Sequence, residues 1–307
     1  MNDFCKILVG IIITSILLKL ADFVVGAWSE EMYYSSKYGI FHRQIYCIKD
    51  SDDELLIMGS SRADHQYVSS IFSDSLLMNT YNAGSEGMCI YYQYAILGSY
   101  VERRSFPKMV ILDVQDLDVI KSLGMTFTLE AALDRLAPHY GEYNVIDEIF
   151  GLKGWKEKIK MQSKTYRYNS KLVQTIKCNY IPSHEDRGYE AVAGNLPDDI
   201  KFENTIYDNG EIELEKVNYF IKFIELCKKN NIKLLVVYSP IYMNSATASM
   251  KFIKKICEKR GVDFWDYSND PYMIKREYFR DTQHLNDKGA HVWSSYLSHI
   301  IKTKYLK

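Results

Sequence analysis

The chain has 307 residues, of which 47% are hydrophobic and 25% are charged. This length is enough for one large α/β domain with extra segments, and the composition excludes a wholly disordered chain. The 38 basic and 39 acidic residues give a net charge of −1 with no lysine- or arginine-rich face, so nothing in the sequence supports a nucleic-acid partner.

The N-terminal segment is apolar enough to enter a membrane. Residues 7–18 carry no charge, and after Lys19 and Asp22 the apolar character resumes over residues 23–28. The whole stretch has about the length that a membrane-spanning helix needs. We therefore expect residues 1–28 to form an uncleaved membrane anchor. A cleaved signal segment and a buried soluble helix are the alternatives.

The charges around this segment bear on its orientation. Lys6 and the amino terminus precede it, while Glu30 and Glu31 follow it. This asymmetry favours an inside N-terminus, with the remainder of the chain extracytoplasmic. Residues 29–53 are expected to connect the anchor to the domain that follows.

From residue 54 onward, short apolar runs alternate with helical patterns. The runs are rich in β-branched and aromatic residues and are bounded by Gly, Pro or Asp, so each predicts a strand: residues 54–58, 77–81, 109–114, 233–238 and 262–265. Amphipathic patterns predict helices over residues 91–103, 213–230, 246–260 and 288–302. Strand and helix in alternation predict an α/β fold with a mainly parallel five-stranded sheet covered on both faces.

One long stretch interrupts this alternation. Residues 117–210 contain further helical patterns, at 128–136, 145–149 and 168–178, followed by a loop rich in Gly, Pro, Asp and Asn. A connection of this length is usually a subdomain or a lid. We expect a domain over residues 54–307 with an insertion at about residues 117–210.

A serine follows the first predicted strand directly. The strand runs into Gly59-Ser60-Ser61-Arg62, and a helix is expected to follow. Since ligands of parallel sheets bind beyond the carboxyl ends of the strands, the Ser61 hydroxyl would lie at the edge where a site is expected. Backbone N–H groups at the start of a helix can also stabilise a developing oxyanion. Taken alone, a serine here is more often a helix cap.

Two further segments supply partners for such a serine. Residues 82–87 (Asn-Ala-Gly-Ser-Glu-Gly) follow the second strand, where glycine permits close approach of the backbone to a bound oxygen. Near the C-terminus, Asp281 and His284 stand three apart in one loop. A neutral histidine can take the serine proton, and a carboxylate on its other ring nitrogen orients it. Each segment by itself is common.

Together, in this order and at these strand ends, the three segments resemble the SGNH (GDSL-like) hydrolase superfamily. Residues 59–61 match its first block, residues 82–87 its second and residues 281–286 its fifth. The resemblance implies a flavodoxin-like three-layer α/β/α domain and a triad of Ser61, His284 and Asp281. It also implies an oxyanion hole that includes the N–H groups of Ser61 and Gly87.

The third block departs from the superfamily pattern. That pattern ends its strand with Gly-x-Asn-Asp, whose asparagine donates to the oxyanion, whereas this strand ends Leu112-Asp113-Val114-Gln115-Asp116. Gln115 falls at the asparagine position and is expected to donate through its longer amide. A missing donor typically lowers turnover by a factor of about a hundred to a thousand.

The anchor, the helical insertion and the block order also resemble the exported branch of this superfamily, which moves acyl groups on or off cell-envelope polymers. This predicts an esterase or O-acyltransferase acting on acyl esters, acetyl above all, of a surface glycan or envelope polymer, with a membrane acyltransferase as a candidate partner. The alternative is a catalytically degenerate relative that binds glycan or an assembly partner.

The remaining candidates have weaker patterns. Arg62 and Asn82 are candidates for substrate binding, since both belong to the matched blocks. His65, one helical turn after the serine, is more typical of a cap or surface residue, and His184 of a solvated loop. No metal or other cofactor is predicted, because the acidic residues after the third strand (Asp113, Asp116 and Asp118) and the six cysteines lack metal-ligand spacing.

Overall fold

The computed structural model describes residues 3–202, 210–243 and 247–306. Contacts divide the chain into two compact units. The first comprises the described residues of Met1–Ile45 and Leu133–Ser183, and the second those of Tyr46–Ala132 and His184–Lys307. The chain passes from one unit to the other after Ile45, within helix α6 (Leu129–Leu136) and after Ser183.

The second unit contains a five-stranded parallel sheet. Its strands, in chain order, are β1 (Leu55–Met58), β2 (Thr80–Asn82), β3 (Met109–Asp113), β4 (Lys233–Tyr238) and β5 (Asp263–Asp266). In space they lie in the order β2-β1-β3-β4-β5, and Ile57 of β1 is paired with Asn82 on one side and Ile111 on the other. This is the flavodoxin-like order. The predicted fold class is therefore confirmed.

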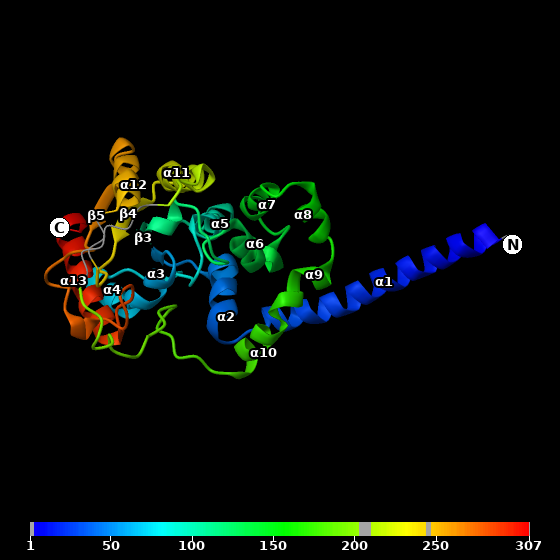
Figure 1. Ribbon diagram of the computed structural model, residues 1–307, viewed down its shortest axis with the longest axis horizontal. Coiled ribbons are helices and arrows are strands. Elements are labelled where there is room, and N and C mark those ends of the chain that lie inside the picture. The colour runs from blue at the N-terminus through cyan, green and yellow to red at the C-terminus, as the bar shows by residue number, and fades with distance from the viewer. Residues whose placement is uncertain (1–2, 203–209, 244–246, 307) are drawn as a thin grey trace. The chain divides into compact units, whose positions relative to one another are not determined.

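Helices cover both faces of this sheet (Figure 1). They are α3 (Ser61–Gln66), α4 (Ser69–Leu76), α5 (Ile90–Glu102), α11 (Leu214–Lys229), α12 (Ala248–Lys259) and α13 (Asp287–Tyr305). Alternate strand residues such as Leu55, Ile111 and Val237 share one core with Trp293 and Leu297 of α13. The intervening strand residues are buried as well, because a parallel sheet in a doubly wound fold meets helices on each side.

The second strand differs from its predicted range. Residues 77–81 were expected to be extended, but α4 continues to Leu76 and Leu77 takes a left-handed conformation (φ 55°) at its C-cap. The side chain of Leu77 is exposed and belongs to the end of the helix. Its apolar character nevertheless extended the predicted strand to residue 77. The predicted helix at 246–260 is α12, and Ala246 lies outside the described residues.

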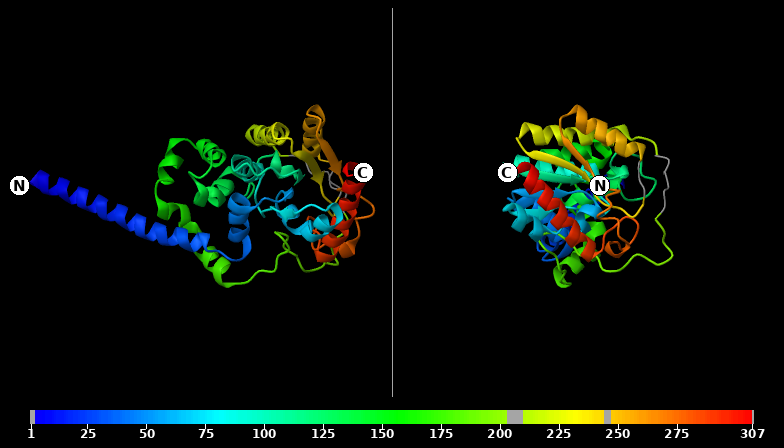
Figure 2. Two further views of the ribbon diagram at one scale, coloured as in Figure 1. Left: turned by 180° about the vertical axis from the view of Figure 1, so that it is seen from behind. Right: turned by 90° about the vertical axis from the view of Figure 1, so that its left-hand side faces the viewer.

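The first unit is helical. Its elements are α1 (Asp3–Tyr34), α2 (Gly39–Ile45), α7 (Asn144–Gly151), α8 (Trp155–Lys160), α9 (Lys164–Tyr168) and α10 (Leu172–Tyr180). Helix α1 is long and apolar enough to cross a membrane. Figure 2 shows the N-terminal part of α1 extending beyond the rest of this unit, and its side chains there are mostly exposed.

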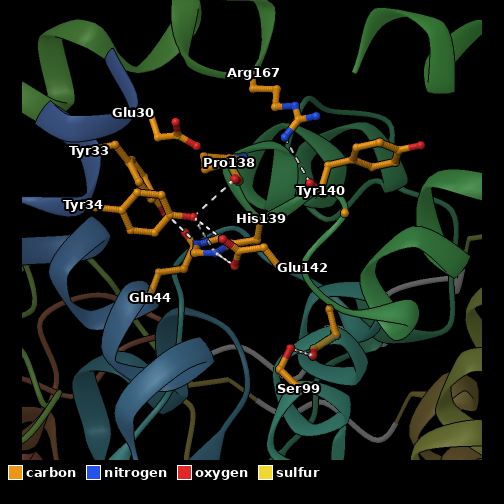
Figure 3. Close-up of polar contacts among 12 residues, drawn as sticks. Glu30, Tyr33, Tyr34, Gln44, Ser99, Pro138, His139, Tyr140, Glu142 and Arg167 are labelled. Carbon is orange, nitrogen blue, oxygen red and sulfur yellow. Dashed lines mark hydrogen bonds and ion pairs between the residues drawn. The ribbon is translucent and has the colours of Figure 1, made fainter. Parts of the chain in front are cut away.

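A buried polar cluster holds the C-terminal end of α1 (Figure 3). The side chain of His139 is fully buried, with Nε2 3.0 Å from the hydroxyl of Tyr33 and Nδ1 2.9 Å from a carboxylate oxygen of Glu142. The hydroxyl of Tyr34 donates to the same carboxylate at 2.7 Å. Because the carboxylate only accepts, Nδ1 of His139 donates and Nε2 accepts. These bonds join α1 to the chain at residues 137–142.

Candidate active site

The nucleophile candidate lies where β1 passes into α3. Gly59 has a φ of +147°, and a Cβ at this position would lie 2.6 Å from the carbonyl oxygen of Asp113. Only glycine allows this turn and this close approach. Ser61 is the first residue of α3, so its backbone N–H is among those that have no partner within the helix.

The loop before α13 presents the other two candidate residues. One carboxylate oxygen of Asp281 accepts from the backbone N–H groups of Gln283 at 2.8 Å and His284 at 2.9 Å, which closes a tight turn. Asn286 then caps α13 by accepting from the N–H of Gly289 at 2.9 Å. The Asp-x-x-His-x-Asn sequence therefore builds both the turn and the helix start that follows it.

His284 lies within hydrogen-bond distance of both other side chains. Ser61 Oγ is 2.8 Å from Nε2 of His284, and Nδ1 of His284 is 3.0 Å from each carboxylate oxygen of Asp281. Because the carboxylate accepts from Nδ1–H, Nε2 is the acceptor facing the serine. Burial by itself would raise the pKa of Asp281, but the hydrogen bonds and charge of His284 bring it below its ordinary value.

A pocket of about 370 Å³ opens beside these residues. Its wall is mixed, with apolar side chains from several strand ends and loops next to polar ones: Ser61, Arg62, Gln115, Asp116, Leu117, Phe127, Tyr238, Ile241, Met243, Thr247, Gln283 and His284. Ligand sites of this kind combine apolar walls with a few placed polar groups. Tyr238 was not singled out in the sequence, although its position at the end of β4 places it at the same sheet edge.

Gln115 lines this pocket, at the position expected for it. Its side-chain oxygen accepts from the backbone N–H of Asp118, and its own backbone N–H donates to the carboxylate of Asp118 at 2.9 Å. The oxygen of the amide is thereby identified, so the other end is the –NH₂ group. That nitrogen, Nε2, is buried and has no hydrogen-bond partner among the residues described.

The second-block residues take different places. Asn82 is fully buried; its amide nitrogen donates to the carbonyl oxygens of Ala63 and Tyr67, and its amide oxygen accepts from the N–H of Gly84. Its amide holds α3 and the following turn, and Asn82 does not line the pocket, so substrate binding by Asn82 stays a prediction. Gly87 (φ +74°) does not line the pocket.

Gly87 is nevertheless hydrogen-bonded to a residue of the pocket wall. Its carbonyl oxygen accepts from the backbone N–H of Phe127 at 2.7 Å, and Phe127 lines the pocket. The role of the Gly87 N–H as an oxyanion donor stays a prediction.

Arg62 is buried at the pocket wall. Its Nη2 donates to the carbonyl of Val114 and lies 3.5 Å from the carboxylate of Asp113, and its guanidinium stacks 4.6 Å above the ring of Tyr238. Burial alone would lower the pKa of Arg62, but the carboxylate of Asp113 raises it above its ordinary value. Nη1 has no hydrogen-bond partner among the described residues, so substrate binding by Arg62 stays a prediction.

The acidic residues at the end of β3 and just after it bind separate partners. Asp113 accepts from the hydroxyl of Tyr67 at 2.6 Å, Asp116 accepts from the hydroxyl of Thr247 at 2.5 Å, and Asp118 accepts from the backbone N–H of Gln115 at 2.9 Å. Within the described part of the chain, no three His, Cys, Asp or Glu side chains are arranged to hold a metal ion.

The two other histidines considered in the sequence have different surroundings. The ring of His65 lies 6.4 Å from that of His284, edge to face, and its Nδ1 is 2.8 Å from the carbonyl oxygen of Glu190. His65 therefore packs beside the candidate base without a hydrogen bond to it. His184 does not line the pocket.

One protein-family model, which has no descriptive name, matches residues 146–306. The chain belongs to that family. No curated protein matches the chain. Among solved structures, the chain is similar to one described as a "putative acylhydrolase" from Bacteroides fragilis, with 13% identity and a TM-score of 0.37, covering 81% of this chain and 86% of that one. At this level of similarity the function has to be argued from the residues themselves.

Proposed function

We propose that this chain is a serine-dependent acyl esterase or O-acyltransferase of the SGNH type. The observation that carries the proposal is the contact of 2.8 Å between Ser61 Oγ and His284 Nε2, with Asp281 on the other ring nitrogen. This geometry provides a nucleophile, a base and a group that orients the base. The order of the matched segments along a flavodoxin-like sheet agrees with it.

In the proposed reaction, Ser61 Oγ attacks the acyl carbon while its proton passes to Nε2 of His284. The negative charge that develops on the carbonyl oxygen is stabilised by N–H donors, for which Ser61, Gly87 and Gln115 are the candidates. The C–O bond to the leaving alcohol then breaks, and the alcohol takes the proton from His284. An acyl-serine remains. Water or a second hydroxyl then attacks it by the same steps, regenerating Ser61.

Asp281 keeps His284 in the productive state during these steps. Its carboxylate accepts from Nδ1–H, so Nε2 is free to take the serine proton, and its negative charge stabilises the imidazolium that forms. The lowered pKa of Asp281 keeps this charge present throughout the neutral range.

The pocket supports an acyl ester as substrate. Leu117, Phe127, Ile241 and Met243 give it apolar surface for an acyl group, while Arg62 and Gln115 provide polar groups near the same place. We propose acetyl or another acyl ester on a surface glycan or envelope polymer. We further propose that α1 anchors the chain in a membrane, with the second unit outside the cytoplasm and a membrane acyltransferase as a candidate partner.

Labelling with a fluorophosphonate probe tests the nucleophile. The wild-type chain should be labelled covalently, whereas Ser61→Ala should not; Ser60→Ala, at the neighbouring serine, is the matched control and should label like wild type. Equal and negligible labelling of the wild-type and Ser61→Ala proteins, both folded by circular dichroism, would overturn the enzyme proposal in favour of a non-catalytic binding protein.

A further inference from the structure

Helix α8 carries exposed apolar and basic side chains together. Trp155 and Ile159 are 67% and 60% exposed and stand four residues apart, so they share one face of the helix. None of the six residues of α8 is buried. The segment around them is basic, with four exposed lysines against one acidic residue, Glu157: Lys153, Lys156, Lys158 and Lys160.

The contact between α1 and α9 determines where the free part of α1 ends. The carboxylate of Asp22 accepts from the backbone N–H groups of Lys164 and Thr165, at 3.1 and 3.0 Å, and from the hydroxyl of Ser163. One turn later, a Cβ on Gly26 would lie 2.3 Å from the Cβ of Lys164, so the two helices touch closely there. From Asp22 onward one side of α1 is therefore packed against its own unit, while Phe23, Val24, Val25 and Trp28 remain exposed.

The part of α1 that precedes this contact matches a bilayer in length. Residues 3–21 form 19 helical residues, which at about 1.5 Å of rise each span roughly 28 Å. The hydrocarbon core of a bilayer is about 30 Å thick. If α1 crosses the bilayer, the surface of the bilayer therefore lies close to Asp22 and to the residues that Asp22 binds.

A short, packed segment connects helix α8 to the residues that Asp22 binds. It ends at Lys160, three residues before Ser163, and the intervening Met161 is buried and bonded through its carbonyl oxygen to Nε of Arg167 at 2.7 Å. Figure 1 shows α8 and α9 at the end of this unit from which the free part of α1 extends. The position of α8 along the membrane normal is thus tied to the position of α1.

From this placement we infer that α8 and the turn before it lie in the headgroup layer of an anionic bilayer. Tryptophan is favoured at that depth because its ring is apolar and its N–H is polar. The lysines bury their aliphatic stems and keep their ammonium groups among the lipid phosphates. The inference rests on the proposed membrane anchor and is independent of the proposed esterase activity.

Helix α10 offers an internal comparison. Tyr180 is 72% exposed, as much as Trp155, and its neighbour Asn179 donates to the backbone carbonyl oxygen of Met32 in α1. Met32 is ten residues further along α1 than Asp22, about 15 Å from the membrane level. The exposed side chain of Tyr180 should therefore remain in water.

The test uses the full chain reconstituted into vesicles. Cys5→Ser removes the one cysteine that is not buried, and a fluorophore is then attached at Ile159→Cys, at Tyr180→Cys or, as the insertion control, at Ile12→Cys. Quenching is measured with nitroxides on the lipid and with acrylamide, an uncharged quencher, in the water. In anionic vesicles, acrylamide should quench the label at 159 at least about threefold less than the label at 180, because the interface buries it by several ångströms.

A second arm tests the charge. Replacing Lys153, Lys156 and Lys158 with serine should bring acrylamide quenching at 159 in anionic vesicles up to its value in zwitterionic ones, since each lysine contributes about fivefold to partitioning. Equal acrylamide quenching at 159 and 180, with the label at 12 shielded, would overturn the inference while leaving the anchor intact. A label at 12 open to acrylamide would overturn the anchor and the inference with it, and neither result would affect the fluorophosphonate assay.

Discussion

The amide of Gln115 is the part of the proposed site that a single substitution tests most sharply. Gln115→Met keeps the length of the side chain but removes both N–H donors. If Nε2 stabilises the oxyanion, its loss should lower kcat about a hundredfold or more, which corresponds to about 2.7 kcal/mol of transition-state stabilisation. KM should change little, because the interaction is made only as charge develops on the oxygen.

The structure also provides the competing explanation. Gln115 caps the short 3₁₀ turn η2 (Asp116–Asp118), and Gln115→Met removes the side-chain acceptor for the N–H of Asp118. Loss of such a cap costs about 1 kcal/mol of folding stability. A purely structural role would therefore lower Tm by a few degrees and leave kcat nearly unchanged. A loss of Tm is thus expected in either case, and the two roles differ in the expected change in kcat.

Steady-state hydrolysis of p-nitrophenyl acetate, with Tm measured on the same samples, separates these patterns. Gln115→Glu keeps the acceptor for the cap but replaces the donor with a negative charge, so it should lose at least as much kcat as Gln115→Met while retaining more of the Tm. Gln115→Asn restores a donor on a shorter side chain and should fall between wild type and Gln115→Met. A folded Gln115→Met that retains kcat within about threefold of wild type would refute the oxyanion role.

Three further substitutions have effects with a defined sign. Hydrogen bonds and charge from His284 lower the Asp281 pKa although burial opposes this. The ionised carboxylate of Asp281 therefore stabilises the folded protein above the carboxyl pKa of the unfolded chain. This stabilisation is lost as pH falls through the lower pKa of the folded protein, so the difference in Tm between wild type and Asp281→Asn should narrow below about pH 4. Asp118 has the opposite shift, because burial raises its pKa to about 7. Wild-type stability is therefore lost as pH rises from about 4 towards 7, and the Tm of Asp118→Asn should rise relative to that of wild type between about pH 5 and 8. A difference in Tm that stays constant with pH would contradict this. Gly289→Ala would place a Cβ 2.1 Å from the carbonyl oxygen of Tyr278, so calorimetry should show a loss of about 1–3 kcal/mol of stability.

The sequence predicts the sheet well because its central strands are buried on both faces and therefore appear as continuous apolar runs. Residues 233–238, for example, coincide with β4. The edge strand β2 is short, and its apolar signal is shared with the end of α4, which moved the predicted boundary to Leu77. Local apolar content cannot separate a helix end from a strand start when both contribute to one core.

At the candidate site, the sequence predicts contacts between residues that are close in the chain, but it misses contacts that depend on the pairing of strands. Asp281 and His284 lie in one turn, so their contact follows from local sequence. The burial of Asn82 does not, because its partners, Ala63 in α3 and Tyr67 just after it, are brought to it by the pairing of β1 with β2. Likewise, the pairing of β3 with β4 brings together the segments that carry Leu117 and Ile241, two apolar residues of the pocket wall that no motif marks.

The two halves of the proposed catalytic machinery are supported by different parts of the fold. Ser61 and Gln115 each follow a central strand, β1 or β3, and the register of those strands fixes their separation. His284 depends instead on the loop that Gly289 and the cap of α13 hold in place. Disturbing that loop should therefore lower the rate at which Ser61 is deprotonated without moving the oxyanion donors. Fluorophosphonate labelling of a folded Gly289→Ala protein should then be slower than that of wild type. Adding Gln115→Met to Gly289→Ala should lower kcat by nearly the same factor as Gln115→Met does in wild type, because sites without shared contacts act additively.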